Sequence, residues 1–342
     1  MKLTISSEGT AYVSCAAIAA QGFFGLMVDS PALHSAAWIS ALIGALMSLP
    51  VMLCFELLRN HQEGTSGTML RIALMGINAA GAANVLRNIV RSAGFLALDR
   101  TPPAVLLLPL ALVMMLSLMK NGDTIGYSAA VWLRIFPILL LIVFVMQLPY
   151  YRVEWLCPVL GSGWKVIIEQ GVRTAGWFTA IAGIRFAAVE ASGKTRLHRT
   201  MPMICLTGTG IAVLLIALRV MMTPGICPGG RNSWLVRMDS LLSNGRAPLY
   251  LQMPMIVMWY AGHLHLLSCM SFTAAALLQQ VFPNLDGRLC VALTTAVSAL
   301  FSTADILTGY IDPVFQWQFI SLTLLAGFNA ARLGGKACAK NG

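Results

Sequence analysis

The chain has 342 residues, of which 58% are hydrophobic and 11% charged, and its formal net charge is +10. A soluble domain carries roughly 25% charged residues, so this composition excludes an ordinary soluble fold and predicts a polytopic helical membrane protein. The positive charge does not indicate nucleic-acid binding, because Lys and Arg are scattered at helix ends and form no basic stripe.

Ten apolar runs of membrane-spanning length predict ten helices. In chain order they cover residues 10–29, 36–58, 74–98, 102–119, 125–148, 174–191, 201–223, 251–279, 288–306 and 313–332. The loops between them are short except for 149–173 and 224–250, which are rich in Gly, Pro and charge.

The distribution of Lys and Arg over the short loops predicts the orientation in the membrane. One side carries Lys2, Arg59, Arg71, Lys120, Lys194, Arg196, Arg199, Arg288, Arg332, Lys336 and Lys340, whereas the short loops of the other side carry only Arg100. Both termini are therefore predicted to be cytoplasmic and both long loops to lie outside.

Ten helices with both termini on one side favour two halves of five helices each. Because five is odd, the second half must be inverted relative to the first, as in inverted-repeat transporter folds. The sequence thus predicts one polytopic membrane domain over residues 1–342, with a first repeat over about 10–148 and a second over about 174–332.

Glycines interrupt the first helix of each half. "AAQGFFGLMVDSP" contains Gly22 and Gly25, and "RTAGWFTAIAG" contains Gly176 and Gly183. Gly-interrupted helices at matching positions of two repeats point to a binding site at the membrane midplane. We therefore expect broken helices, near Gln21 to Gly25 and near Ala175 to Trp177, that face each other. The alternative is that these glycines only let neighbouring helices approach closely.

Arg87, Arg91, Arg134 and Arg185 fall inside predicted spans. Arg87 lies about 20 Å and Arg91 about 26 Å from the start of the third span. Arg91 is expected to snorkel to the headgroups, whereas Arg87 either binds a carboxylate, of a nutrient or of a partner helix, or snorkels too. Arg185 lies near the midplane if its helix begins at residue 174, and Arg134 lies about 14 Å into its helix. For Arg185 and Arg134 we favour structural contacts.

The eighth span contains His263 and His265, which are two residues apart and cannot form one metal-binding face. The chain shows no nucleophile–base pattern, no glycine-rich phosphate loop and no metal-ligand spacing, so enzymatic activity and a cofactor are not expected. Its eight cysteines include no CxxC pair. Cys157 and Cys227 fall in the two long loops, and whether they pair stays open.

Several segments, in order and spacing, resemble one family. They are "AAWISALIGAL", "RTPPAVLLL", "KNGDTIGYSAAVWLRIFPILLL", "EWLCPVLGSGW" and "SWLVRMDSL". Together they resemble the B subunits of spore-germination nutrient receptors (the GerAB type), which belong to the amino acid–polyamine–organocation superfamily. The resemblance covers residues 10 to 332. It implies an all-α fold of ten helices with a 5+5 inverted repeat and broken helices 1 and 6.

One departure from that family bears on the ligand. Its helix 6 commonly reads Phe-Pro-Phe-Gly-Glu, where this chain has Arg173 to Trp177. The Gly remains, but an indole replaces the carboxylate. We therefore expect an apolar pocket that favours a neutral or aromatic-compatible nutrient over a strongly cationic one. The predicted ligand-binding residues are Gln21, Gly22, Phe23, Phe24, Gly25, Arg87, Ala175, Gly176, Trp177, Tyr260 and His263.

The resemblance also suggests a cation site. In sodium-coupled relatives of this fold, hydroxyl groups of helix 8 join carbonyl groups of helix 1 around the ion. Ser268 and Ser271 share one face of the eighth span and could take that role. Serines that only cap contacts between helices are the commoner case.

The favoured function is a membrane-embedded subunit of a germinant receptor that binds a small nutrient, an amino acid, and triggers germination. The resemblance implies two partners, a larger membrane subunit and a lipoprotein, and a place in the spore inner membrane or cell membrane. The alternatives are an amino acid or amine transporter and a scaffold subunit without a ligand of its own. The missing acid of helix 6 favours sensing or scaffolding over ion-coupled transport.

Overall fold

In a computed structural model of the chain, the described residues are 2–21, 36–59, 65–96, 101–120, 122–147, 154, 163–188, 208 and 249–303. These residues form eight α-helices and no β-strand. The helices are α1 (Ser7–Ala20), α2 (Ala37–Arg59), α3 (Thr65–Leu96), α4 (Pro103–Lys120), α5 (Gly122–Gln147), α6 (Trp164–Ala188), α9 (Leu249–Val281) and α10 (Gly287–Thr303).

Each of these eight helices overlaps a predicted span, so the all-helical membrane class is confirmed. Four helices are long and apolar enough to cross a bilayer by length and composition, with windows over Ala37–Phe55, Gly67–Ala93, Pro103–Lys120 and Val257–Val281. The predicted span at 313–332 lies outside the described residues, as does 201–223 apart from Gly208. The ten-helix inverted repeat therefore stays a prediction.

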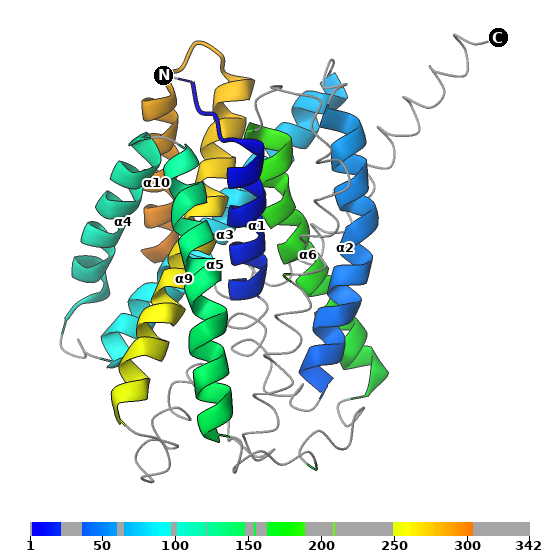
Figure 1. Cartoon of the computed structure of the whole chain (residues 1–342). Helices are drawn as coiled ribbons and strands as arrows, with labels where there is room; N and C mark the ends of the chain where they lie inside the picture. The colour runs from blue at the N-terminus through cyan, green and yellow to red at the C-terminus, as the bar shows by residue number, and fades with distance from the viewer. Residues whose placement is uncertain are drawn as a thin grey trace.

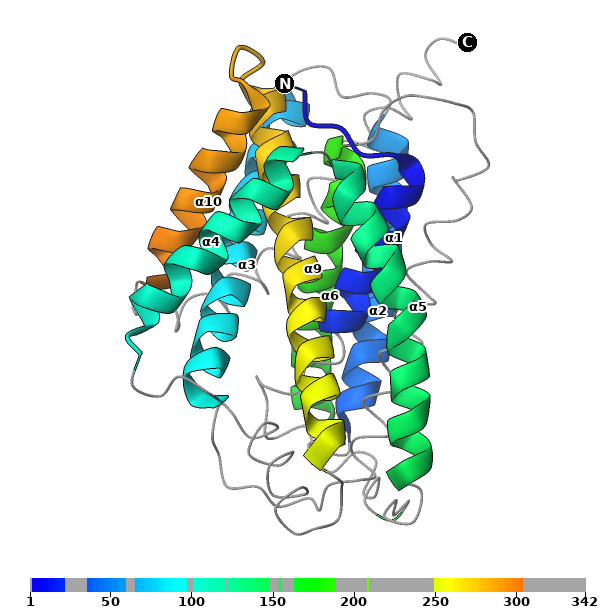
Figure 2. The ribbon, with the colours of Figure 1, turned by 60° about the vertical axis from the view of Figure 1, so that its left-hand side comes forward.

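The helices form one upright bundle in which the direction of the chain alternates (Figures 1 and 2). The end of α4, the start of α5, the end of α9 and the start of α10 all lie at the end of the bundle that holds the N-terminal segment. Hydrogen bonds fix this arrangement, because Ser6 N–H donates to Asp123 Oδ1 at 2.8 Å and Leu3 N–H to Gln279 Oε1 at 2.9 Å. The middle of the bundle is occupied by α9, which packs against α1, α3, α5, α6 and α10.

Helix α6 corrects two predictions. It begins at Trp164, ten residues before the predicted start at 174, and it continues without a break through Ala175, Gly176 and Trp177 to Ala188. The predicted break in this helix is therefore wrong. A glycine makes a helix easier to open but does not open it alone. Threonine hydroxyls on both sides of the glycine bond to the same helix: Thr174 Oγ1 donates to Gln170 O and Thr179 Oγ1 to Ala175 O.

Glycines of this bundle serve close contacts between helices, the alternative named above. A Cβ atom on Gly44 of α2 would lie 2.5 Å from Thr174 Cβ of α6, and one on Gly183 of α6 would lie 3.4 Å from Asn78 Nδ2 of α3. The backbones of α1 and α5 also approach closely, because a Cβ atom on Gly126 would lie 2.6 Å from Gly9 Cα. Small residues at these positions thus set the spacing of the bundle.

Candidate functional site

Contacts among α3, α6 and α9 define the relative register of these three helices. A Cβ atom on Gly183 of α6 would touch Asn78 of α3 and lie 3.6 Å from Thr273 Cγ2 of α9. Helix α3 runs in the direction opposite to α9. Arg87 follows Asn78 by nine residues on α3, and Leu264 precedes Thr273 by nine residues on α9. Both steps cover about 14 Å along the helix axis, so Arg87 lies level with Leu264. Arg87 therefore lies at the depth of the two histidines of α9.

Helix α6 runs in the same direction as α9. Cys269 Sγ lies 3.9 Å from Ile181 O, and Gln280 Nε2 donates to Ala187 O near the ends of both helices. Trp177 precedes Ile181 by four residues and His265 precedes Cys269 by four, about 6 Å along each helix, so Trp177 lies level with His265. Arg87, Trp177, His263 and His265 thus lie at one depth of the bundle, which we call the α9 layer.

The side chains of the α9 layer are buried. Arg87 is 6% exposed, Trp177 4%, His263 5% and His265 8%. A charged group at such a depth is costly and normally faces protein or water. The burial of Arg87 removes the alternative that it snorkels outward. Arg91, one turn further on, is exposed.

Aromatic rings surround α9 in and next to this layer. His263 Nδ1 lies 3.1 Å from Trp259 O, and the His263 and Trp259 rings are 4.1 Å apart between centroids. Tyr260, half-buried, meets Trp259 edge to face at 4.8 Å. Of the predicted residues, His263 and Tyr260 therefore belong to the same aromatic group.

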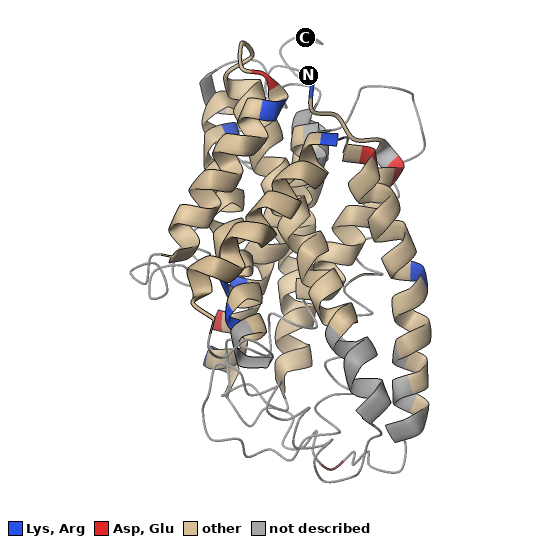
Figure 3. Ribbon diagram, turned by 90° about the vertical axis from the view of Figure 1, so that its left-hand side faces the viewer, with Lys and Arg blue, Asp and Glu red and all other residues tan. Residues whose placement is uncertain are grey.

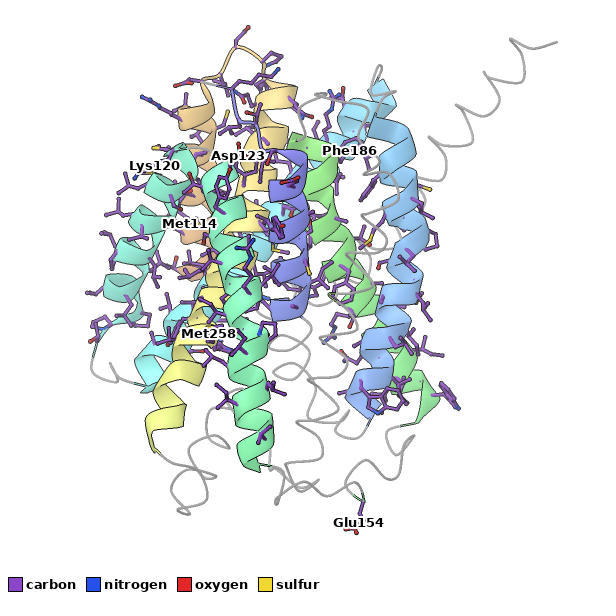
Figure 4. The ribbon with its side chains drawn as sticks, viewed as in Figure 1. Met114, Lys120, Asp123, Glu154, Phe186 and Met258 are labelled. Atoms are coloured by element: carbon purple, nitrogen blue, oxygen red, sulfur yellow. The ribbon has the colours of Figure 1, made fainter. Side chains whose placement is uncertain are left out.

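His265 points to a different helix. Its ring lies 5.9 Å from that of Trp132 on α5, which stacks on Phe136 at 4.3 Å. Trp132 Nε1 donates to Met258 O at 3.3 Å, in the half of α9 further from the N-terminal segment (Figure 4). The two histidines thus face different partners, and the described residues contain no group that could hold a metal ion.

The sequence interpretation did not include Trp132, Phe136 or His265 in the site. The spacing of Trp132 and Phe136, i and i+4 in "VWLRIF", places both on one helix face and was the available signal. Their meeting with His265 depends on how α5 packs against α9, which periodicity within one helix does not specify.

The structure describes only some of the remaining predicted ligand-binding residues. Gln21 is 5% exposed at the end of α1, where its N–H bonds to Ala17 O and Ile18 O. Gly22, Phe23, Phe24 and Gly25 lie outside the described residues, so the break expected there stays a prediction. Ala175 and Gly176 are buried within the unbroken α6, and their backbone groups form part of the helix.

The proposed cation ligands lie on a side of α9 that meets another helix. The buried Ser271 hydroxyl donates to Met114 Sδ of α4 at 3.4 Å, so it is directed to α4 and not to the carbonyl groups of α1. Met114 lies partway along α4 in Figure 4. Ser268 is half-buried. This geometry fits serines that join helices.

Two further arginines were expected to make structural contacts. Arg185 lies about 31 Å along α6 from Trp164 and two residues beyond Gly183, and its position at the membrane midplane stays a prediction. Arg134 of α5 is exposed, so a structural contact inside this bundle does not account for it. Asp and Glu of the described part are drawn toward the two ends of the bundle (Figure 3).

A cavity of about 400 Å³ lies apart from the α9 layer, between α3, α9 and α10. Its lining includes Gly76, Ala80 and Ala83 of α3 and Leu293 and Val297 of α10, and almost all of that lining is apolar. None of the predicted ligand-binding residues lines it. Its chemistry suits a hydrocarbon group and not a charged nutrient.

The α9 layer combines two kinds of recognition. The guanidinium group of Arg87 can bind a carboxylate through two parallel hydrogen bonds. An indole such as that of Trp177 can pack an apolar group or attract an ammonium by cation–π contact, worth about 0.5–2 kcal/mol. A zwitterion with an apolar side chain matches both.

Comparison with known proteins gives one family. A family model described as "Spore germination protein" matches residues 17–306, which include every described helix except part of α1. No curated protein matches the sequence.

Proposed function

The chain belongs to the spore germination protein family, and on that premise we propose that it is the membrane-embedded subunit of a spore nutrient-germinant receptor. It binds a small nutrient, an amino acid, at mid-depth of the membrane and thereby triggers germination. The observation that carries this proposal is the burial of Arg87, 6% exposed, at the depth of Trp177 and His263. A buried guanidinium within a membrane span is a functional candidate with a carboxylate as its natural ligand.

In this proposal the nutrient carboxylate binds Arg87. The backbone N–H groups of Ala175 to Trp177 are not available for it, because they belong to a continuous helix. Trp177 packs against the nutrient side chain with its large apolar face. An indole offers a strongly cationic nutrient only cation–π contact.

The family is of transporter or receptor type, and no enzymatic activity is proposed. The proposed partners are a larger membrane subunit and a lipoprotein of the same receptor. The proposed location is the spore inner membrane or the cell membrane. The ten-helix inverted repeat over residues 10–148 and 174–332 is the proposed architecture.

Thermal unfolding of the purified chain with a panel of amino acids tests the proposal. A bound ligand at one hundred times its dissociation constant adds about 2.7 kcal/mol of stability. We expect neutral amino acids with apolar or aromatic side chains to raise the unfolding temperature and lysine or arginine to leave it unchanged. Trp177→Ala should remove the increase, whereas Trp164→Ala, at a position 57% exposed on the same helix, should keep it. An equal increase with every amino acid in both variants would contradict the proposal.

The proposed topology places Trp164, at the start of α6, outside the cell and both termini in the cytoplasm. We expect a cysteine introduced as Trp164→Cys to react with an impermeant maleimide added to intact cells. A cysteine introduced as Lys2→Cys should react only after the membrane is permeabilised. The reverse pattern of labelling would invert the topology.

A further inference from the structure

Helix α5 carries a charged residue on its outer face halfway along its length. Arg134 is exposed, and it lies about 18 Å from Gly122 and about 20 Å from Gln147 along the helix axis. Neither end of the helix is near enough to make this an ordinary terminal arginine. A guanidinium group at such a depth in hydrocarbon is costly, and membrane proteins normally direct it to protein or water.

The surroundings of Arg134 form a regular stripe. Six exposed residues of α5 follow one another at alternating spacings of four and three, and we call these six the α5 stripe. They are Tyr127 (76% exposed), Val131 (52%), Arg134, Ile138 (61%), Leu141 (61%) and Val145 (53%). Thr124, Ser128, Ile135, Pro137 and Ile142 on the same helix are exposed as well. A spacing of 3.5 residues is the pattern by which one helix packs along another.

Other outer faces of the described bundle lack this feature. The exposed large residues of α4, such as Leu108, Val113 and Leu116, and those of α10, such as Leu293 and Leu300, are apolar. Lys120 and Arg288 lie at the ends of those helices. These faces suit contact with lipid, whereas the α5 stripe has a charge at its centre.

We propose that the α5 stripe docks a membrane-spanning helix of a second protein, and that this helix carries an Asp or Glu at mid-depth opposite Arg134. Such a carboxylate would complete a charge-assisted hydrogen bond in a medium of low dielectric, where it is strong. Apolar residues on the partner would cover the rest of the stripe. The inference does not depend on nutrient binding in the α9 layer.

A second copy of this chain does not meet the same requirement. Two copies in one membrane share their orientation, so a symmetric contact through α5 relates them by a two-fold axis and places Arg134 beside Arg134 of the other copy. Like charges at this depth would repel each other. The charge of the stripe therefore favours a different protein.

Photo-crosslinking of the full chain in its native membrane tests the inference. A photoreactive phenylalanine replaces Ile138, one turn from Arg134, and in a control chain it replaces Val113, 63% exposed on the outer face of α4. We expect the probe at Ile138 to attach to a membrane-spanning peptide of another protein that contains an Asp or Glu. Attachment to lipid only, to a second copy, or to a segment without an acid would overturn the proposal.

Substitutions in the same chain test the charge itself. Arg134→Leu should lower the crosslink yield at Ile138 at least about tenfold, because a partner carboxylate would lose its counter-charge in the membrane. Arg134→Lys should keep most of the yield. We expect Arg134→Leu to fold, because Leu on an outer face suits contact with lipid. The abundance of the chain, measured in parallel, checks this.

Exchange of the charges gives the decisive result. Arg134→Glu combined with Arg in place of the identified acid of the partner should restore the crosslink, whereas either change alone should remove it. An unchanged yield in Arg134→Leu and Arg134→Glu would show that the charge has no part in docking and would overturn the proposal.

Discussion

Replacing Arg87 with Met should raise the nutrient concentration needed for half-maximal germination at least about 30-fold, because loss of one partner from a buried charged contact costs about 2–5 kcal/mol. Met keeps much of the length and apolar stem of Arg, so the change removes mainly the charge. Germination of spores that carry the variant is measured over a range of nutrient concentrations. The abundance of the chain in the spore membrane is measured alongside.

Arg91→Met is the matched control for this prediction. Arg91 lies one turn further along α3 and is exposed, so its replacement should leave the nutrient dose dependence near that of the original chain. Arg87→Lys should fall between the two, because it keeps the charge but loses the two parallel hydrogen bonds of a guanidinium group. If Arg87→Met is present at normal abundance with an unchanged dose dependence, Arg87 does not bind the nutrient.

The second large effect is expected at the crossing of α1 and α5. In Gly126→Ala the new Cβ atom would lie 2.6 Å from Gly9 Cα, a backbone atom that no side-chain rotation can move away. The two helices must separate, and we expect a loss of about 1–3 kcal/mol in the free energy of unfolding. The fall in the unfolding temperature of the purified chain in detergent measures it.

Gly76→Ala provides the comparison, because no atom lies within 4 Å of the position of its Cβ atom. Alanine there should leave stability unchanged or increase it by about 0.5–1 kcal/mol, since Gly in a helix interior loses more conformational entropy on folding. Equal unfolding temperatures for Gly126→Ala and Gly76→Ala would show that the α1–α5 crossing tolerates a side chain.

The sequence by itself determined the class of the protein and the places of its described helices. Long apolar runs can be satisfied in a membrane only by helices that pair their own backbone groups, so length and composition are sufficient to locate them. The family was also accessible from the sequence, because the order and spacing of its segments resemble it over most of the chain.

The start of α6 was harder to predict. Residues 164–173 mix apolar Val166 and Ile167 with charged Lys165 and Glu169, so composition placed them in a loop. The structure makes them helical, with Ile167 buried and Lys165 exposed. A helix that extends beyond the hydrocarbon loses its apolar composition before it ends. Likewise, the sequence alone does not distinguish a glycine that permits a helix break from a glycine that permits close packing between helices.

Only the tertiary structure decided which side of each helix meets protein. Two arginines at similar depth have opposite surroundings, because Arg87 is buried at the level of α9 whereas Arg134 is exposed on α5. The meeting of His265 with Trp132 and the direction of Ser271 toward Met114 also depend on contacts between helices. In a membrane the lipid-facing side of a helix is as apolar as its protein-facing side, so hydrophobic periodicity carries little information about rotation, and packing between helices sets it.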